Sequence, residues 1–483
     1  MTRLLDRRSF LRAAGAAAAA ASFAPRLRIG RARGANDFLT RHVVVVAIGG
    51  GLRLSESLGM AEGATLPNLF GQTPLVAGFG ASPAGAPRIA QEYAAAVRPL
   101  VTPAPLATPL HTQGTLVTNL RYAEGAPGHL QGQACLFTGA YNNIENRGDA
   151  RAPAPTLFEL HRREKNAPAT DAWYVSTVGG FYRAIQSSAH PEFGPRFGGS
   201  FLQPPGSLSA ILPIVTSGRR KVVFDASLSL PIIEDPDDER RAAERLTAVL
   251  DGNTRAYAAD EPVFRSTPDE NGAIEAHLGG FYADPTYQAY YPDSVAIGTV
   301  KPDGGLDPTG DALTTYHAER LLARFKPAVM CMTLLDIDAA HTDFNGYLRG
   351  QIIADACVRH LWEMIQATDG LRDQTTMIVL PEHGRHLFHN GQNPDSLGRS
   401  GLDHGQGDDG DRNVWMLALG PDVKAGQVLA PTGVAQTGRS SGRYESIDAT
   451  MLAATLLGYG DLMTGELSGL GMRPGIVPAE VLR

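Results

Sequence analysis

Cysteine is scarce in this sequence. Only three occur among the 483 residues, Cys135, Cys331 and Cys357, and each has apolar neighbours on both sides. This excludes a small scaffold held together by several disulfides and predicts buried thiols that behave as small hydrophobic side chains. A disulfide between two of them is the alternative if the compartment is oxidising.

A strong positive charge and long apolar runs are also missing. The formal net charge is −7 at pH 7, and no basic block occurs beyond the start of the chain. A nucleic-acid partner is therefore not expected. No stretch has the roughly 20 apolar residues of a membrane-spanning helix, so we expect no stable membrane span.

The first residues have the pattern of a twin-arginine export signal. Arg7 and Arg8 precede Ser-Phe-Leu-Arg, and an alanine-rich run of modest hydrophobicity follows over 13–24. We expect residues 1–35 to be a signal segment that the twin-arginine translocon reads, and the protein to be periplasmic or secreted. The alternative is a basic N-terminal helix that stays on the protein.

Four apolar runs predict the central strands of an α/β domain over 36–483. They cover 42–48, 328–335, 375–380 and 413–419. Such continuous runs are typical of strands buried on both faces. An amphipathic stretch between the second and third runs, about Tyr347 to Ala367, predicts a helix. The order strand, helix, strand indicates a largely parallel, doubly wound sheet flanked by helices.

Two other regions complete the expected organisation. Thr156 follows two prolines and has Glu159 three residues later, which is the pattern of a capping box at the start of a helix. Residues 180–310 are rich in Gly, Pro, Tyr and Asp, with one charged helical stretch at 237–250. We expect an insertion or cap there rather than a second independent core.

Carboxylates and histidines gather after three of the predicted strands. The residues are Asp336, Asp338, His341, Glu382, His383, Asp403 and His404. Open parallel sheets bind ligands at the carboxyl ends of their strands, so these side chains are expected to meet. Imidazole and carboxylate groups bind divalent ions when deprotonated. The pattern therefore predicts one or two divalent ions, zinc or a similar metal, with Asp336 and Asp338 as alternative ligands.

With these motifs the chain resembles the alkaline-phosphatase superfamily, which includes sulfatases and nucleotide phosphodiesterases. The resemblance implies an alkaline-phosphatase-like fold in which Asp338, His341 and His404 hold one ion. It also implies that Glu382 and His383, alone or with His129, hold a second ion or orient a water. Here the family's Asp-His pair has become Glu-His, and Asp338 lies one residue closer to His341 than is usual.

A narrower resemblance is to a branch of this superfamily that is exported by the twin-arginine route. It is carried by Glu-His-Gly-Arg at 382–385, Asp-His-Gly at 403–405 and the glycine-rich turn after the first predicted strand. Together with the wider motifs, the likeness covers about 40–160 and 315–460.

Two positions depart from the family pattern. Active members place a metal-binding Asp at the end of the first strand, where this chain has Gly50 and Gly51. They also place a hydroxyl or modified-cysteine nucleophile ahead of a Thr-Gly pair, and the matching residue before Thr138 is His129. His129 is then a metal ligand, a general base or a phosphorylatable residue, or a histidine that only packs beside the pocket.

Two hypotheses of function follow. The first is an exported metal-dependent hydrolase of phosphate or sulfate esters, or of a related small anionic substrate, in which water activated by the metal replaces the hydroxyl nucleophile. Its catalytic residues would be His129 and Arg385, the latter clamping an oxyanion. The second is a non-catalytic metal-binding or ligand-binding protein with a degenerate site of this kind.

The export signal generates the first prediction. Replacing Arg7 and Arg8 by Lys should leave precursor in the cytoplasm, because the translocon reads the arginine pair itself rather than positive charge in general. Fractionation of the producing cells followed by immunoblotting measures this. An unchanged periplasmic yield from the double variant would remove the twin-arginine interpretation.

Overall fold

The computed structural model describes the greater part of the predicted domain. The described residues are 38–58, 65–72, 75, 100–141, 151–177, 185–194, 197–203, 227–229, 297–300, 306–307, 309–387, 402–405, 409–429, 444–472 and 480–483. The expected signal segment, the helical stretch 237–250 and most of the expected insertion lie outside them. Among the described residues, no helix is long and apolar enough to cross a bilayer.

A mixed sheet of ten strands forms the centre of the described residues, in the order β12-β3-β11-β10-β1-β9-β4-β5-β6 with β13 beside β3. These strands are β1 (His42–Ile48), β3 (Thr115–Arg121), β4 (Ala172–Val175), β5 (Ser200–Gln203), β6 (Ser227–Ser229), β9 (Val329–Leu334), β10 (Thr375–Pro381), β11 (Asn413–Leu419), β12 (Gln427–Leu429) and β13 (Tyr444–Glu445). A smaller sheet joins β2 (Leu100–Val101), β7 (Gly298–Val300) and β8 (Leu306–Asp307).

Strand β1 lies at the middle of the large sheet. It pairs in parallel with β9 on one side and with β10 on the other, and Val44 is opposite both Met330 and Met377. The prediction of a largely parallel sheet is therefore confirmed, and each of the four predicted strands is present. The last of them, β11, runs antiparallel to β10, so the sheet is mixed at that side.

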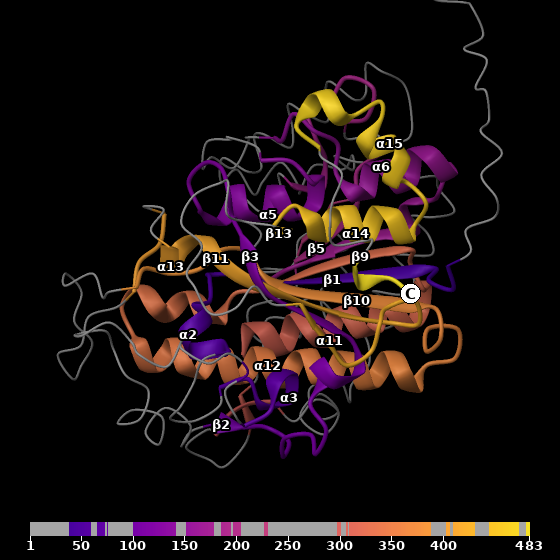
Figure 1. The fold of residues 1–483 in the computed structure, drawn as a ribbon. Coiled ribbons are helices and arrows are strands. Elements are labelled where there is room, and N and C mark those ends of the chain that lie inside the picture. Colours follow the sequence, from indigo (N-terminus) through magenta and orange to yellow (C-terminus); the bar gives the residue numbers. More distant parts are fainter. Residues whose placement is uncertain are drawn as a thin grey trace, which may run out of the picture. The chain divides into compact units, whose positions relative to one another are not determined.

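Helices cover both faces of this sheet (Figure 1). On one face lie α2 (Leu54–Ser57), α3 (Pro67–Phe70), α11 (Gly310–Phe325) and α12 (Phe344–Ala367), the last of which contains the predicted amphipathic helix. On the other face lie α5 (His129–Thr138), α6 (Leu157–Lys165), α14 (Asp448–Leu456) and α15 (Gly460–Thr464).

The alternation of side chains along β1 explains why its sequence is apolar throughout. Val44 and Val46 point into the core shared with α11 and α12. Val43 and Val45 point into the core shared with α5, α6 and α14. Because successive strand residues face opposite sides, a strand covered on both faces needs apolar side chains at every position. Cys331 and Cys357 lie in these cores and Cys135 in a smaller cluster with Tyr122 and Ile447; all three are buried as predicted, and none forms a disulfide.

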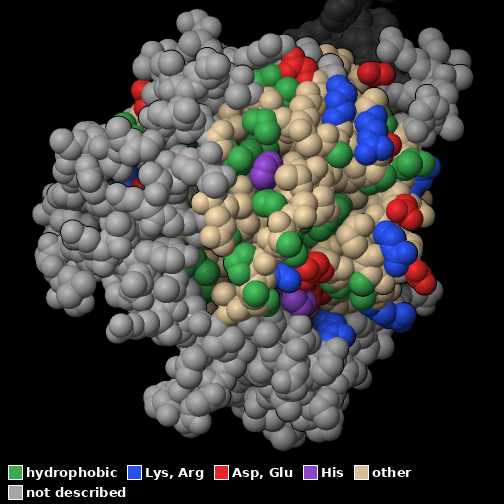
Figure 2. All heavy atoms as spheres, turned by 60° about the horizontal axis from the view of Figure 1, so that its bottom comes forward, with side chains coloured by type: hydrophobic (Ala, Val, Ile, Leu, Met, Phe, Trp, Pro, Cys, Tyr) green, Lys and Arg blue, Asp and Glu red, His purple; other side chains and the backbone are tan. Residues whose placement is uncertain are grey.

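The helix-covered face that carries α12 is only partly described. Figure 2 turns this side of the molecule toward the reader, and Lys and Arg side chains lie there beside Asp and Glu. On α12, Arg359 Nε lies 3.0 Å from Glu363 Oε1, one turn further along the helix. Such mixed charge is typical of a solvated helix surface.

Helix α6 begins with the capping box that the sequence predicts. The Glu159 carboxylate accepts a hydrogen bond from the Thr156 backbone N–H at 2.7 Å, and the Thr156 hydroxyl accepts one from the Glu159 N–H at 3.4 Å. The same carboxylate accepts from the Ser188 N–H and hydroxyl at 3.0 and 2.8 Å. This one side chain therefore caps α6 and also joins the start of that helix to the segment that contains Ser188.

We expect Thr156→Ala to lower the free energy of unfolding by about 1 kcal/mol, because it removes one half of a buried capping box. Urea unfolding followed by far-ultraviolet circular dichroism measures the change. Thr112→Ala is the control. The Thr112 side chain is exposed on the short helix η1 (Leu110–Gln113), which has no side-chain capping bond. Equal stability of the two variants would contradict the capping role.

Candidate metal centre

Six side chains from separate parts of the chain meet beyond the carboxyl ends of β9 and β10. They are His129, the first residue of α5; Asp338 and His341 from η7 (Asp336–His341), which follows β9; Glu382 and His383, which follow β10; and His404 from the segment 402–405. The expected gathering of carboxylates and histidines at these strand ends is therefore present. Parallel pairing of β9 and β10 with β1 brings the segments together.

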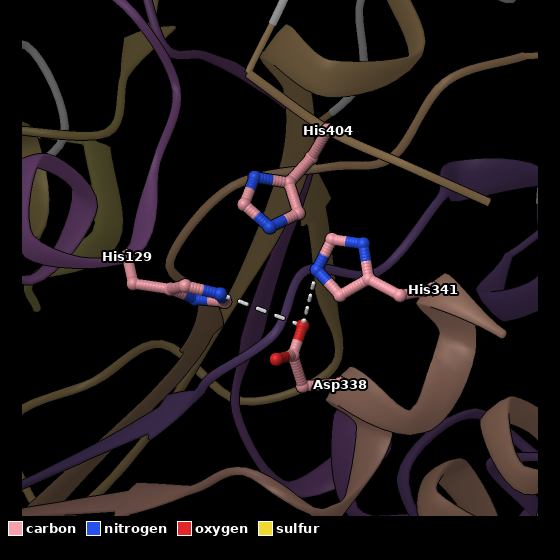
Figure 3. A group of neighbouring side chains, drawn as sticks. All are labelled: His129, Asp338, His341 and His404. Atoms are coloured by element: carbon pink, nitrogen blue, oxygen red, sulfur yellow. Dashed lines mark ion pairs between the residues drawn. The ribbon is translucent and has the colours of Figure 1, made fainter. Parts of the chain in front are cut away.

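The first group contains His129, Asp338, His341 and His404 (Figure 3). In each of them one nitrogen or oxygen lies within 4.8 Å of the corresponding atom in the other three. Asp338 Oδ1 is 3.2 Å from His341 Nε2 and 3.5 Å from His129 Nε2. Figure 3 shows these rings and the carboxylate turned toward one point between η7 and α5.

The second group contains His129, Glu382 and His383. Glu382 is fully buried, and its Oε1 atom accepts hydrogen bonds at 2.6 Å from the Gly50 N–H and from His129 Nδ1. Its Oε2 atom accepts from the Gln133 amide at 2.6 Å. His129 thus belongs to both groups, with a different ring nitrogen facing each.

Three of the histidines have their tautomer set by an oxygen at Nδ1. His341 Nδ1 is 2.7 Å from Asp403 Oδ1, His383 Nδ1 is 2.7 Å from the Gly384 carbonyl, and His404 Nδ1 is 3.3 Å from the Pro127 carbonyl. These oxygens only accept hydrogen bonds, so Nδ1 carries the proton and Nε2 presents a lone pair. Metal-binding histidines are oriented in this way by the partner of their second nitrogen.

Two of these lone pairs are buried without a partner. The Nε2 atoms of His383 and His404 have no hydrogen-bond partner, and their ring centroids are 4.1 Å apart. The Nε2 lone pair of His383 also faces Glu382 Oε1 at 3.3 Å. An unpaired buried polar atom costs about 1–3 kcal/mol. A divalent ion would satisfy both nitrogens and neutralise the carboxylates, so the residues present fit a metal.

The electrostatics of the cluster set the protonation of its members. Burial lowers the pKa of His383 and, together with the neighbouring cationic groups, that of His404, so both are neutral. Burial raises the pKa of Asp338 and Glu382, but hydrogen bonds and charge from His129 outweigh it and leave both carboxyls ionised. For His129 burial lowers the pKa, but the nearby Glu382 and Asp338 carboxylates outweigh burial and raise it to about 9, so the ring holds both protons until an ion displaces them.

Arg385 lies beside Asp338 rather than facing open space. Its guanidinium is fully buried and donates to Asp338 Oδ1 and to the Leu402 carbonyl. This arrangement holds the Asp338 carboxylate toward His341 and His129. The oxyanion clamp expected from the sequence remains a prediction, and a role in positioning Asp338 is what the contacts favour.

The structure decides between the two alternative aspartates. Asp336 turns away from the cluster and accepts a hydrogen bond from the Asp311 N–H at the start of α11, at 3.0 Å. Asp338 is the carboxylate within reach of the histidines. His386, which follows the Glu-His-Gly-Arg element of the sequence, lies outside both groups, with its Nε2 atom 3.2 Å from Asp411 Oδ2.

The two glycines after β1 are required by close packing. Gly50 has φ +81°, and a Cβ there would lie 2.8 Å from Asp338 Cα and Cβ. Gly51 has φ +79°, and a Cβ there would lie 2.5 Å from His383 Nδ1. L-amino acids with side chains rarely adopt this backbone conformation. A side chain at position 50 would therefore displace Asp338, which is itself a ligand candidate.

Sequence reasoning missed two contributors to the cluster and the role of a third residue. Gln133 stands one turn after His129 and fixes the far oxygen of Glu382, while its own carbonyl accepts from Thr333 at 3.2 Å. The Gly50 N–H fixes the near oxygen. Asp403 was expected in the cluster, but its hydrogen bond to His341 Nδ1 was not. The i,i+4 spacing of His129 and Gln133 was the only sequence signal, and it is too common to be informative.

Comparisons with known proteins give structural neighbours but no sequence relatives. No family model matches the chain, and no curated protein matches it. An alkaline phosphatase PafA mutant has a TM-score of 0.43 at 9% identity, with 86% of this chain and 96% of that chain covered. A sulfatase from Pseudoalteromonas sp., PsFucS1, has a TM-score of 0.38 at 12% identity, with 87% and 68% covered.

A third neighbour is a protein in the alkaline phosphatase superfamily from Vibrio parahaemolyticus, with a TM-score of 0.36 at 11% identity and 87% and 66% coverage. These neighbours are members of the superfamily that the sequence motifs resemble. Identities this low, with TM-scores below 0.5, do not establish an activity for this chain.

The geometry of the cluster generates a metal-binding prediction. His404→Ala should lose most of the bound zinc after loading and dialysis, because it removes one of the two buried Nε2 lone pairs that have no other partner. Elemental analysis of the purified protein measures the zinc content. His190→Ala, a histidine outside both groups, is the control and should keep the full content. Full occupancy in the His404 variant would show that this residue is not a ligand.

Proposed function

We propose that this protein is an exported, metal-dependent hydrolase of phosphate or sulfate esters or of a related small anionic substrate. The observation that carries the proposal is the convergence of histidine Nε2 atoms on two ionised carboxylates, with two of those nitrogens buried and unpartnered. Such an arrangement is costly unless a cation occupies it. The export part of the proposal is supported by the arginine pair near the start of the sequence.

Asp338, His341 and His404 would hold one ion, and Glu382 with His383 would hold a second. When bound, such ions lower the pKa of water and stabilise the negative charge that develops on a departing oxygen. Zinc suits this set of nitrogen and oxygen ligands, although the donor set by itself also accepts similar divalent metals.

The residues around these ligands orient them. Asp403 holds the His341 ring through Nδ1, and Gln133 holds Glu382 through Oε2. Arg385 and two divalent ions would together carry more positive charge than Asp338, Glu382 and Asp403 carry negative charge. The centre would therefore attract an anionic substrate and repel a cationic one.

The absence of a hydroxyl at the position of His129 favours attack by water over a covalent serine or threonine intermediate. The imidazole is held at Nδ1 by Glu382 and lies between the two groups. Water, oriented by the chain's own carboxylates and imidazoles, is then the attacking group.

A non-catalytic binding protein is the second candidate. It is supported by the tight packing of Gly50 against Asp338, which leaves no room for a further carboxylate at that strand end. In this case the metal would serve stability or recognition of an anionic ligand. A fold by itself does not decide between the two functions.

A panel of substrates tests the proposal. Zinc-loaded protein should hydrolyse at least one of p-nitrophenyl phosphate, bis(p-nitrophenyl) phosphate and p-nitrophenyl sulfate, and should lose turnover when a chelator is added. Asp403→Ala should lower turnover by about 10–100-fold, because it releases the His341 ring. Asp369→Ala, at an exposed aspartate, is the matched control.

Mass spectrometry of the enzyme quenched during turnover should find no phosphorylated serine or threonine. Absence of turnover on all three substrates by fully metal-loaded protein would favour the binding protein over the hydrolase.

A further inference from the structure

His129 is the one residue shared by the two ligand groups of the described chain. Its Nδ1 atom lies 2.6 Å from Glu382 Oε1, in the group that contains His383. Its Nε2 atom lies 3.5 Å from Asp338 Oδ1, in the group that contains His341 and His404. The two nitrogens of one rigid ring therefore face two different sets of potential ligands.

The spacing between ligand atoms is that of tetrahedral sites. An ion with ligands at about 2.0–2.1 Å separates neighbouring ligand atoms by roughly 3.3–3.4 Å. The distances here are 3.2 Å between His341 Nε2 and Asp338 Oδ1, 3.5 Å between His129 Nε2 and Asp338 Oδ1, and 3.3 Å between His383 Nε2 and Glu382 Oε1. The contact between His129 Nδ1 and Glu382 Oε1 is shorter, at 2.6 Å, because it is a hydrogen bond in which no ion lies between the two atoms.

We propose that His129 is a bridging ligand, with Nε2 binding one ion and Nδ1 binding the other. The first ion would then have His129, Asp338, His341 and His404, and the second would have His129, Glu382 and His383. Without His129 the second group has only two members, which hold an ion poorly. This inference rests on the metal centre proposed above and is independent of hydrolysis.

The surroundings of His129 hold its ring between the two groups. The ring centroid lies 4.6 Å from that of His404 and 5.3 Å from that of His383. One turn along α5, a Cβ on Gly132 would lie 2.8 Å from the Glu382 carbonyl oxygen. This glycine lets the helix approach the end of β10 closely enough for the ring to reach Glu382.

Binding through both nitrogens requires both to be free of protons. The ring protons pass to solvent as the two ions bind, as protons of other ligands do when metals displace them. The ring then carries one negative charge, shared between two cations. Ions joined in this way are magnetically coupled when they are paramagnetic, which gives a measurement that does not depend on activity.

The experiment uses the full chain loaded with Cu²⁺ in place of zinc. Elemental analysis should find two copper ions per chain. The electron paramagnetic resonance signal at low temperature should account for far fewer spins than copper ions, because a shared imidazole ring couples the two. His129→Ala should bind one copper ion per chain, and its signal should account for every ion. His190→Ala should behave as the unaltered protein does.

His129→Gln is a second variant if His129→Ala does not fold, as judged by circular dichroism. Glutamine offers a single end group that can reach only one ion, so the coupling should also disappear. Two uncoupled copper ions in the unaltered protein, one ion only, or coupling that survives in either variant would overturn the bridge. Failure to bind any copper would overturn both the bridge and the proposed centre, whereas coupled ions without hydrolysis would leave the bridge standing and remove the hydrolase.

Discussion

The buried carboxylate of Glu382 is the interaction on which the arrangement of the site depends. A fully buried negative charge is costly unless it is paired and hydrogen-bonded. Here it receives the Gly50 N–H, the His129 imidazole and the Gln133 amide. Through these three contacts it joins the end of β10 to the turn after β1 and to the first turn of α5, and so places His129 beside η7.

The site also brings together imidazole lone pairs that cannot form hydrogen bonds with one another. His383 and His404 are neutral because burial disfavours their charged forms, and their Nδ1 protons are already committed to carbonyl oxygens. Two neutral rings with inward-facing lone pairs, next to ionised carboxylates, form a site that attracts a cation. This polar cluster stands on apolar strands whose packing with the helices keeps its members in place.

The glycines of the site show how a departure from a family pattern can be a structural requirement. In the sequence, Gly50 stands where active members of the resembled family have a metal-binding aspartate. In the structure its positive φ and its closeness to Asp338 show that a side chain there would displace a ligand candidate. His129 likewise stands where that family has its nucleophile. In the structure it contacts both the Glu382 and the Asp338 carboxylates.

The sequence by itself determined the parallel core and the candidate ligands. A strand covered on both faces must be apolar at every position, and four runs of that kind were enough to predict β1, β9, β10 and β11 with the helix between two of them. Their order along the chain also indicated which strand ends would share one edge. These signals are local, because they depend on periodicity and on the residue types that follow each strand.

Only the tertiary structure decided which of those residues lie together. Asp336 and Asp338 are two residues apart, and the short helix after β9 turns one toward α11 and the other toward His341. The partners of Glu382 come from positions 50, 129 and 133, which no local pattern connects. Such contacts depend on how closely a helix approaches a strand end and on which way a ring faces, and both are set by packing between segments far apart in the chain.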